Sequence, residues 1–193
     1  MKLATRDLLA ELLLEALDDQ VAADAIRTRT GTLATQFQSE QAEVTAKLTR
    51  YVAVLDEWKT EHPSSERETA LKKAALVFNH HLFFEVHEVL EIQWRRESGD
   101  ARRFLQGLIQ VAVAFYHLER RNFRGALALL HDGLEKITPY QPAFLGVELQ
   151  EFVARLTACY DELHRLGSEN FDQFQVTRIP RMQWAALEGD PAP

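Results

Sequence analysis

The sequence is poor in cysteine, glycine and proline. Cys159 is the single cysteine among 193 residues, so an internal disulfide is excluded and nothing indicates an oxidising compartment. The 8 glycines and 6 prolines fall between periodic segments, which leaves long stretches free to form helices. Long apolar runs are missing as well, because charged side chains interrupt the apolar start of the chain, namely Arg6, Asp7, Glu11 and Glu15. We therefore expect a soluble, cytoplasmic protein without a membrane span.

Basic side chains are also in the minority. The chain carries 22 basic and 29 acidic side chains, which gives a formal net charge of −7. This balance argues against nucleic acid as a partner, because binding to a polyanion relies on a broad basic surface. Hydrophobic residues at 46% and charged residues at 26% are typical of a globular protein. The length suits one domain with a core of its own and an additional segment.

What the sequence does have is helical periodicity over most of its length. Apolar residues recur at three- and four-residue spacing, which predicts an all-α fold. We expect a helical bundle of stacked antiparallel helix hairpins with an N-terminal helical arm. The predicted helices cover residues 5–18, 22–61, 66–79, 82–97, 101–119, 123–137 and the segment from Pro142 to Gly167.

The clearest break in this pattern is HPSS at residues 62–65. Its proline interrupts the preceding helix, and Ser65 with Glu68 forms a capping box for the next one. After Gly167 the sequence loses its helical period, although apolar residues continue. We therefore expect three parts, which are an N-terminal helical hairpin or arm at 1–62, a helical core domain at 63–167, and a C-terminal strap with a disordered tail at 168–193.

The second predicted helix carries a seam like that of a coiled coil. Its apolar positions follow three- and four-residue spacing, with Gln41 in one slot, at Phe37, Val44, Leu48, Tyr51, Leu55 and Trp58. This seam either packs within the chain, as a hairpin with the first helix or on the core, or it dimerises. We favour packing within the chain. A protein partner or self-association through the N-terminal arm is the corresponding prediction for interactions.

A weak internal repeat relates the two central hairpins. An offset of 40 residues places Phe83 on Phe123 and Leu90 on Leu130. Each unit is a helix, a tight turn, an aromatic residue and a second helix. Because such hairpins cannot bury their inner faces alone, they stack on one another, as tetratricopeptide-type hairpins do.

The most informative segment is FNHHLFFEVHEVLEIQW at residues 78–94. His87, Glu88 and Glu91, which we call the His87 cluster, lie within about one helical turn, at the edge of an apolar arc. An imidazole and carboxylates beside such an arc lose hydration, so they need polar partners. The next helix is apolar nearly all round except for three polar residues, and we expect this stripe to face the His87 cluster. The stripe is formed by Gln106, Gln110 and His117.

Three interpretations of the His87 cluster remain open. The first is a buried hydrogen-bond network that fixes the packing of the hairpins, in a protein-binding or scaffold module. The second is a divalent metal site that uses His87, Glu91 and His117, in a metal-dependent enzyme or a metal sensor. The third is acid–base catalysis by His87 with Glu91. We favour the first, and the residues leave open whether the protein is an enzyme.

Two spaced motifs resemble a known family. Residues 78–94 follow the pattern FN-x-x-x-F-x-E-x-HE-x-LE-x-x-W, and residues 104–117 follow FLQGLIQ-x-A-x-A-x-YH. Together they are similar to the family called domain of unknown function 309, which usually has a glycine at the position of His81. The resemblance implies an all-α fold and no particular activity. It also implies a shared site at Glu85, His87, Glu88, Glu91, Trp94, Gln106 and His117.

Overall fold

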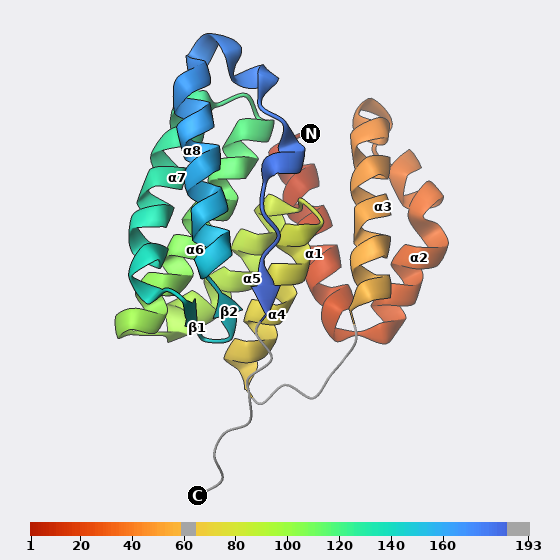
Figure 1. Cartoon of the computed structure of the whole chain (residues 1–193). Coiled ribbons are helices and arrows are strands. Elements are labelled where there is room, and N and C mark those ends of the chain that lie inside the picture. The colour runs from red at the N-terminus through yellow and green to blue at the C-terminus, as the bar shows by residue number, and fades with distance from the viewer. Residues whose placement is uncertain (59–64, 185–193) are drawn as a thin grey trace, which may run out of the picture.

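The chain forms a stack of helices, shown in Figure 1, in a computed structural model that describes residues 1–58 and 65–184. The prediction of an all-α fold is confirmed. Within the described residues the helices are α1 (Leu3–Asp18), α2 (Gln20–Thr35), α3 (Gln41–Glu57), α4 (Glu66–Asn79), α5 (Phe83–Arg96), α6 (Gly99–Glu119), α7 (Phe123–Ile137) and α8 (Gln150–Asn170). None of these helices combines the length and hydropathy that are needed to cross a lipid bilayer.

Three two-residue strands form one small antiparallel sheet beside the helices. They are β1 (Ala143–Phe144), β2 (Val147–Glu148) and β3 (Gln183–Trp184), in the order β1-β2-β3. Phe144 pairs with Val147 across the first two strands, and Val147 pairs with Trp184 across the second pair. The sheet therefore joins the connection between α7 and α8 to a segment near the end of the described chain.

Some sequence predictions lie outside the described residues. These are the break at residues 62–64, the domain boundary after residue 62 and the disordered end of the tail. Ser65 is described, and its side chain accepts a hydrogen bond of 3.1 Å from the backbone N–H of Glu68. This cap starts α4 at the predicted residue, because the serine oxygen satisfies an N–H that has no partner within the helix.

The long helix predicted over residues 22–61 is wrong as a single element. It consists of α2 and α3, which are separated by residues 36–40 and a short 3₁₀ turn at Gln38–Glu40. Phe37 leaves the helical conformation with φ −111° and ψ 56°, whereas Gly31 lies inside α2. Threonine and glycine have low helix propensity, so the segment before the break gains little from continuing as a helix. The chain reverses there, and α3 packs back on α2.

The three N-terminal helices pack against the rest of the molecule. In Figure 1, α2 and α3 stand side by side, and α1 lies between them and the other helices. Val44, Leu48 and Tyr51 of the predicted seam are fully buried and belong to the same apolar core as the residues of α4–α8. Trp58 also donates a hydrogen bond from Nε1 to the backbone oxygen of Leu17, at 3.1 Å. The seam is thus covered within one chain.

The two central hairpins repeat each other in backbone geometry. His81 between α4 and α5 and Arg121 between α6 and α7 both adopt left-handed conformations, with φ of 56° and 58°. After each, a backbone N–H returns to the carbonyl five residues earlier, from Leu82 to Val77 at 3.1 Å and from Asn122 to His117 at 2.8 Å. This pattern of a left-handed residue and a returning hydrogen bond is a common way to end a helix. The offset of 40 residues therefore relates equivalent turns.

Helices α6 and α7 come close to each other at two glycines. A Cβ atom on Gly107 would lie 2.6 Å from Cγ2 of Ile137 and 3.2 Å from the backbone oxygen of Gly133. A Cβ atom on Gly133 would lie 2.9 Å from the backbone oxygen of Gly107. These separations are shorter than van der Waals contact, so only hydrogen fits at either position.

The described segment after α8, which we call the C-terminal strap, runs back over the helices to β3 (Figure 1). Gly167 interrupts the helical conformation with φ 69°, and the chain continues through short turns to β3. Phe174, Ile179 and Met182 are buried beneath this segment, whereas Val176 is exposed. The side chain of Asn79 makes two hydrogen bonds to the backbone of Met182, donating to its oxygen at 2.9 Å and accepting from its nitrogen at 2.7 Å.

Candidate functional site

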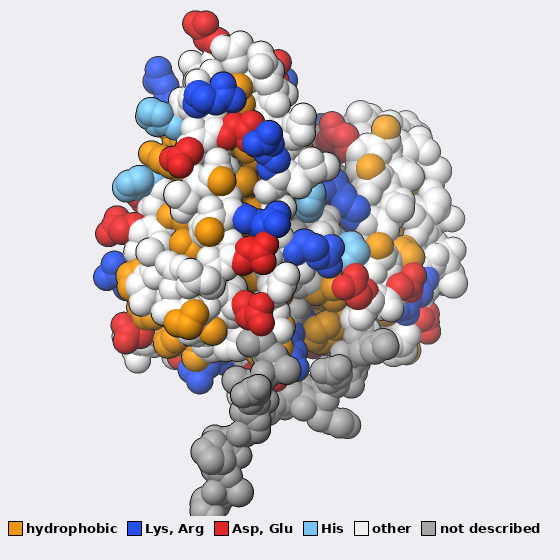
Figure 2. Space-filling model, in the orientation of Figure 1, with side chains coloured by type: hydrophobic (Ala, Val, Ile, Leu, Met, Phe, Trp, Pro, Cys, Tyr) orange, Lys and Arg blue, Asp and Glu red, His pale blue; other side chains and the backbone are white. Residues whose placement is uncertain are grey.

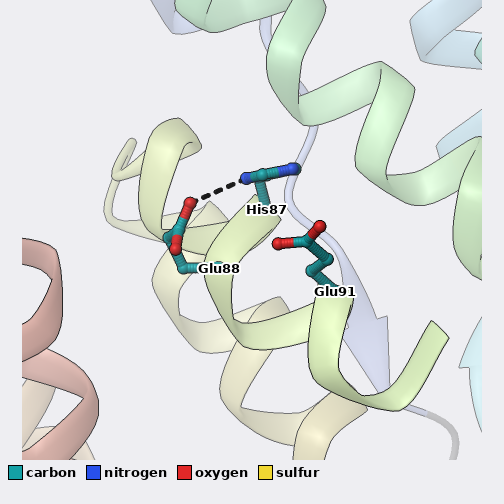
Figure 3. Close-up of side chains that lie close together, drawn as sticks. All are labelled: His87, Glu88 and Glu91. Atoms are coloured by element: carbon teal, nitrogen blue, oxygen red, sulfur yellow. Dashed lines mark hydrogen bonds and ion pairs between the residues drawn. The ribbon is translucent and has the colours of Figure 1, made fainter. Parts of the chain in front are cut away.

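The His87 cluster lies on one turn of α5. Its residues are at positions i, i+1 and i+4 of the helix, so their side chains project toward the same side. One ligand atom from each of the three side chains can be chosen so that all lie within 4.8 Å of one another. Figure 3 shows Glu88 on one side of the imidazole ring and Glu91 on the other. His87 Nδ1 is 2.9 Å from Glu88 Oε1.

The cluster is half-exposed rather than buried. The side chains of His87, Glu88 and Glu91 retain 31%, 33% and 30% of their accessible surface. Glu91 accepts a hydrogen bond of 2.7 Å from Nη2 of Arg95, one turn further along the same helix. The polar groups therefore keep water on one side and find protein partners on their own helix. Burial does not force them to pair with another helix.

The polar stripe of α6 does not complete the cluster. Nδ1 of His117 lies 3.1 Å from Nδ2 of Asn122, near the turn at the end of α6. Oε1 of Gln110 is buried without a hydrogen-bond partner, and Gln106 is half-buried. Among the described residues, no hydrogen bond or ion pair connects this stripe to the His87 cluster. The expected buried network between the two helices is therefore not formed, and His117 is separated from the other two candidate metal ligands.

Trp94 occupies the end of α5 that faces the start of α6. The guanidinium carbon of Arg102 lies 3.8 Å from the centre of its ring, and Nη1 of Arg102 donates to the backbone oxygen of Trp94 at 3.0 Å. Nε1 of Trp94 is buried and has no hydrogen-bond partner. These contacts give Trp94 a packing role between the two helices. It stands one turn beyond Glu91 on the half-exposed side of α5.

Glu85 points away from the His87 cluster toward α3. Its side chain is 1% exposed, accepts a hydrogen bond of 2.6 Å from the hydroxyl of Tyr51, and pairs with Nζ of Lys47 at 2.5 Å. Burial, reinforced by the charge of Glu85, raises the pKa of Tyr51 well above its ordinary value. The tyrosine therefore stays protonated and donates to the carboxylate.

Sequence reasoning missed the two partners of Glu85. Lys47 and Tyr51 are more than 30 residues away in the chain, and only a tertiary contact brings them to α5. One signal was present, because Lys47 stands one turn before Tyr51 beside the apolar seam of α3. A lysine beside a seam that is buried on the core requires a buried acid as its partner.

A cleft opens above Glu85 between α3, α5 and the end of α6. It has a volume of about 440 Å³, and its walls include Lys47, Arg50, Phe84, Tyr116, Glu119 and Arg120. Glu119 is an exposed residue, yet the surrounding protein desolvates its carboxyl group. This desolvation raises the pKa of Glu119 to about 7, although the positive charges of Arg50 and Lys47 act to lower it. Figure 2 shows basic side chains where α3 meets the rest of the molecule. A second concave surface thus exists on the other side of α5.

Comparison with known proteins places the His87 cluster inside a recognised domain. Residues 71–129 match the family described as Domain of unknown function (DUF309). The chain is also 29% identical over 89 residues to an uncharacterized protein, YpuF, of Bacillus subtilis (strain 168). That alignment covers 45% of this chain and 51% of the relative, so the chain spans about half the length of the curated relative that it matches. Neither description carries an activity.

Proposed function

We propose, for a chain whose residues 71–129 match the family described as Domain of unknown function (DUF309), that the His87 cluster binds a divalent metal ion. The observation that carries the proposal is the imidazole of His87 between two carboxylates on one turn of α5, with one atom from each of the three side chains within 4.8 Å of the others. The side chains are half-exposed, so an ion reaches them without a rearrangement of the core. A structural network is the weaker alternative, because the cluster has no hydrogen bond to the polar stripe of α6 among the described residues.

The two carboxylates have different roles in this proposal. Glu88 holds Nδ1 of His87, which leaves Nε2 to face the ion, and Glu91 supplies a carboxylate oxygen from the other side of the ring. A carboxylate that orients a metal-binding histidine in this way is common in metal sites. Mixed nitrogen and oxygen ligands suit zinc, manganese or iron better than calcium, which takes oxygen ligands.

Two protein ligands leave several coordination positions to water. Such an open position allows an ion to polarise a bound water or substrate, which is the chemistry of a metal-dependent enzyme. A site with only two protein ligands also binds its ion with moderate affinity. In addition, Glu91 must give up its hydrogen bond from Arg95 when it binds the ion. We therefore expect an exchangeable ion rather than a permanent structural one.

Calorimetric titration of the untagged protein with Zn²⁺ and Mn²⁺ tests this proposal. We expect one saturable site that His87→Ala and Glu91→Gln each abolish, since both remove a ligand. Glu88→Gln should weaken binding by about 10- to 100-fold, as the loss of an orienting partner does. His131→Ala is the matched control, because His131 lies 3.6 Å from the neighbouring acid Asp132 on α7 and is exposed. Binding that survives both ligand substitutions, or no saturable binding of either ion, would contradict the proposal.

A second candidate function is self-association through the N-terminal arm. Exposed large apolar side chains concentrate there among the described residues, with Leu3, Leu8 and Val21 on α1 and α2. Exposed Ile92 of α5 lines a groove of about 350 Å³ that α1, α4 and α5 form together. Exposed apolar side chains mark a contact surface when they adjoin one another.

Light scattering during size-exclusion chromatography tests the second candidate. We expect the combined change Leu8→Glu and Ile92→Glu to convert a dimer into a monomer, because it places charges on the apolar surface. Val176→Glu is the control, since Val176 is equally exposed but lies in the C-terminal strap. A wild-type protein that is monomeric at all concentrations would rule out self-association.

A further inference from the structure

The cleft above Glu85 is separate from the His87 cluster. Glu85 and His87 are two residues apart, which places them about 200° apart around the axis of α5. The cleft is bounded by α3 of the N-terminal arm and by the end of α6, neither of which contributes to the His87 cluster. A ligand in the cleft would therefore make contacts that the metal proposal does not use.

The floor of the cleft is fixed and electrically balanced. Glu85 is neutralised by Lys47 and receives a hydrogen bond from Tyr51, and all three side chains are buried. A buried ion pair with this many partners holds its geometry, because any rotation leaves a charge without compensation. The charge of Glu85 is therefore not available to a ligand, nor is that of Lys47.

One wall of the cleft is also held in place by specific contacts. The guanidinium of Arg6 lies over the ring of Phe84, 3.8 Å from its centre, and donates a hydrogen bond of 3.1 Å to the hydroxyl of Tyr116. Phe84 and Tyr116 in turn contact each other, with ring centres 5.6 Å apart. The aromatic wall is thus tied to α1, α5 and α6 at once.

The remaining charged residues of the cleft leave an excess of positive charge. Among the described residues that line it, Arg50 and Arg120 form no ion pair, whereas Glu43 pairs with the backbone amine of Met1. Arg50 uses one nitrogen, Nη1, to donate to the backbone oxygen of His81 at 2.9 Å, and Arg120 makes a contact of 3.5 Å with that of Met1. Each guanidinium has further N–H groups to offer. Two guanidiniums therefore face one unpaired carboxylate, that of Glu119.

We propose that this cleft binds the dianionic group of a small molecule, a phosphate or a dicarboxylate, between Arg50 and Arg120. The cleft volume of about 440 Å³ suits a compact ligand. Guanidinium groups favour anions of this kind, because their planar N–H donors match two oxygens of a carboxylate or phosphate. The aromatic wall of Phe84 and Tyr116 would pack against the uncharged part of the ligand.

Titrations of the protein with inorganic phosphate and with succinate test this inference. Each titration is followed through the backbone amide signals in NMR spectra. The ionic strength is kept constant, with chloride as the reference salt. We expect saturable amide shifts around residue 50 and residues 119–120 for at least one of the two anions. The anion that saturates at lower concentration identifies the preferred head group. Shifts that rise linearly with both anions, without saturation, would overturn the proposal.

Single substitutions then locate the site. Arg50→Gln and Arg120→Gln should each weaken binding by about tenfold or more, because each removes a charged hydrogen-bond donor. Arg50→Gln also removes the hydrogen bond to the backbone oxygen of His81 and can loosen that turn. Arg120 makes only the long contact of 3.5 Å to Met1, so Arg120→Gln tests the site without this side effect. Arg103→Gln is the control, at the opposite end of α6, and His87→Ala should leave anion binding unchanged. Equal affinity in wild type and Arg120→Gln, or an equal loss in Arg103→Gln, would refute the proposal.

Discussion

At the scale of single residues, His81 and Arg121 carry backbone strain at equivalent turns. Both adopt a left-handed conformation that disfavours any residue with a Cβ atom, by about 1–2 kcal/mol. His81 has compensating contacts, since its ring stacks on Phe83 with centres 5.5 Å apart and its carbonyl accepts a hydrogen bond from Arg50. Arg121 has less, namely a guanidinium 5.4 Å from the centre of the ring of Phe171.

We therefore expect Arg121→Gly to stabilise the protein. Glycine adopts the left-handed conformation without strain, and its greater freedom in the unfolded chain offsets only part of that gain. The free energy of unfolding should rise by up to about 1 kcal/mol in urea denaturation. Arg121→Val is the control and should lower it, because a β-branched residue is strained most in this conformation. A glycine variant less stable than the wild type would show that the contact with Phe171 outweighs the strain.

At the scale of helices, the contact between α3 and α5 depends on one buried ion pair. Lys47 and Glu85 are both buried, and Tyr51 adds a hydrogen bond to the same carboxylate. Removal of one partner of such a pair leaves an uncompensated charge in the interior. We therefore expect the loss of one partner alone to cost more stability than the loss of both.

A double-mutant cycle in urea denaturation measures this contact. Lys47→Met should lower the free energy of unfolding by about 3–5 kcal/mol, because Glu85 then loses its counter-charge. The combined change Lys47→Met and Glu85→Gln should be less damaging than Lys47→Met alone, since a neutral amide still accepts from Tyr51. If the double variant lost the sum of the two single effects, the two side chains would not be coupled.

The sequence predicted those features of the helices that depend on local interactions. The start of α4 followed from Ser65 and Glu68, and the polar residues of the His87 cluster were found because helical spacing brings them together. The break between α2 and α3 was missed, since neither proline nor glycine marks residues 36–40. Lys47 was missed as the partner of Glu85 because the two residues are 38 positions apart. The periodicity of one helix does not indicate which residue of another helix it contacts.

The expected network with the polar stripe of α6 shows a different limit. Periodicity located both stripes, but it does not tell how deeply a helix face is buried. The His87 cluster keeps about a third of its surface in water, so hydration replaces the partners that full burial would have required. The grouping of the three side chains on α5 was thus predictable, whereas their surroundings were not.

At the scale of the whole molecule, Asn79 joins parts of the chain that are 103 residues apart. Its amide satisfies both backbone polar groups of Met182 and thereby fastens the C-terminal strap to the end of α4. Phe174, Ile179 and Met182 are buried where the strap crosses the helices. The strap is therefore part of the core rather than an addition to its surface.

Asn79→Ala should release the strap locally. We expect the amide of Met182 to lose its protection in hydrogen exchange, because its acceptor is removed, and the free energy of unfolding to fall by about 1–3 kcal/mol. Asn170→Ala serves as the control, since Asn170 is exposed and its side chain makes only local hydrogen bonds, to the backbone oxygen of Leu166 at 3.4 Å and from Nε2 of Gln173 at 3.2 Å. Unchanged protection of the Met182 amide in the Asn79 variant would mean that apolar burial alone holds the strap.

The glycine contact between α6 and α7 has a mechanical consequence. At Gly107 and Gly133 the two backbones come close, and the side chains of Ile137 and Val111 pack directly against the glycines, which leaves no room for the helices to slide. We expect these two helices to move as one rigid body. The junction of the N-terminal helices with α5 is different, because side chains rather than backbone cross it, namely Lys47 from α3 to Glu85 and Arg6 from α1 to Phe84. Any opening that admits a ligand should therefore be a displacement of the N-terminal arm against a rigid pair of helices.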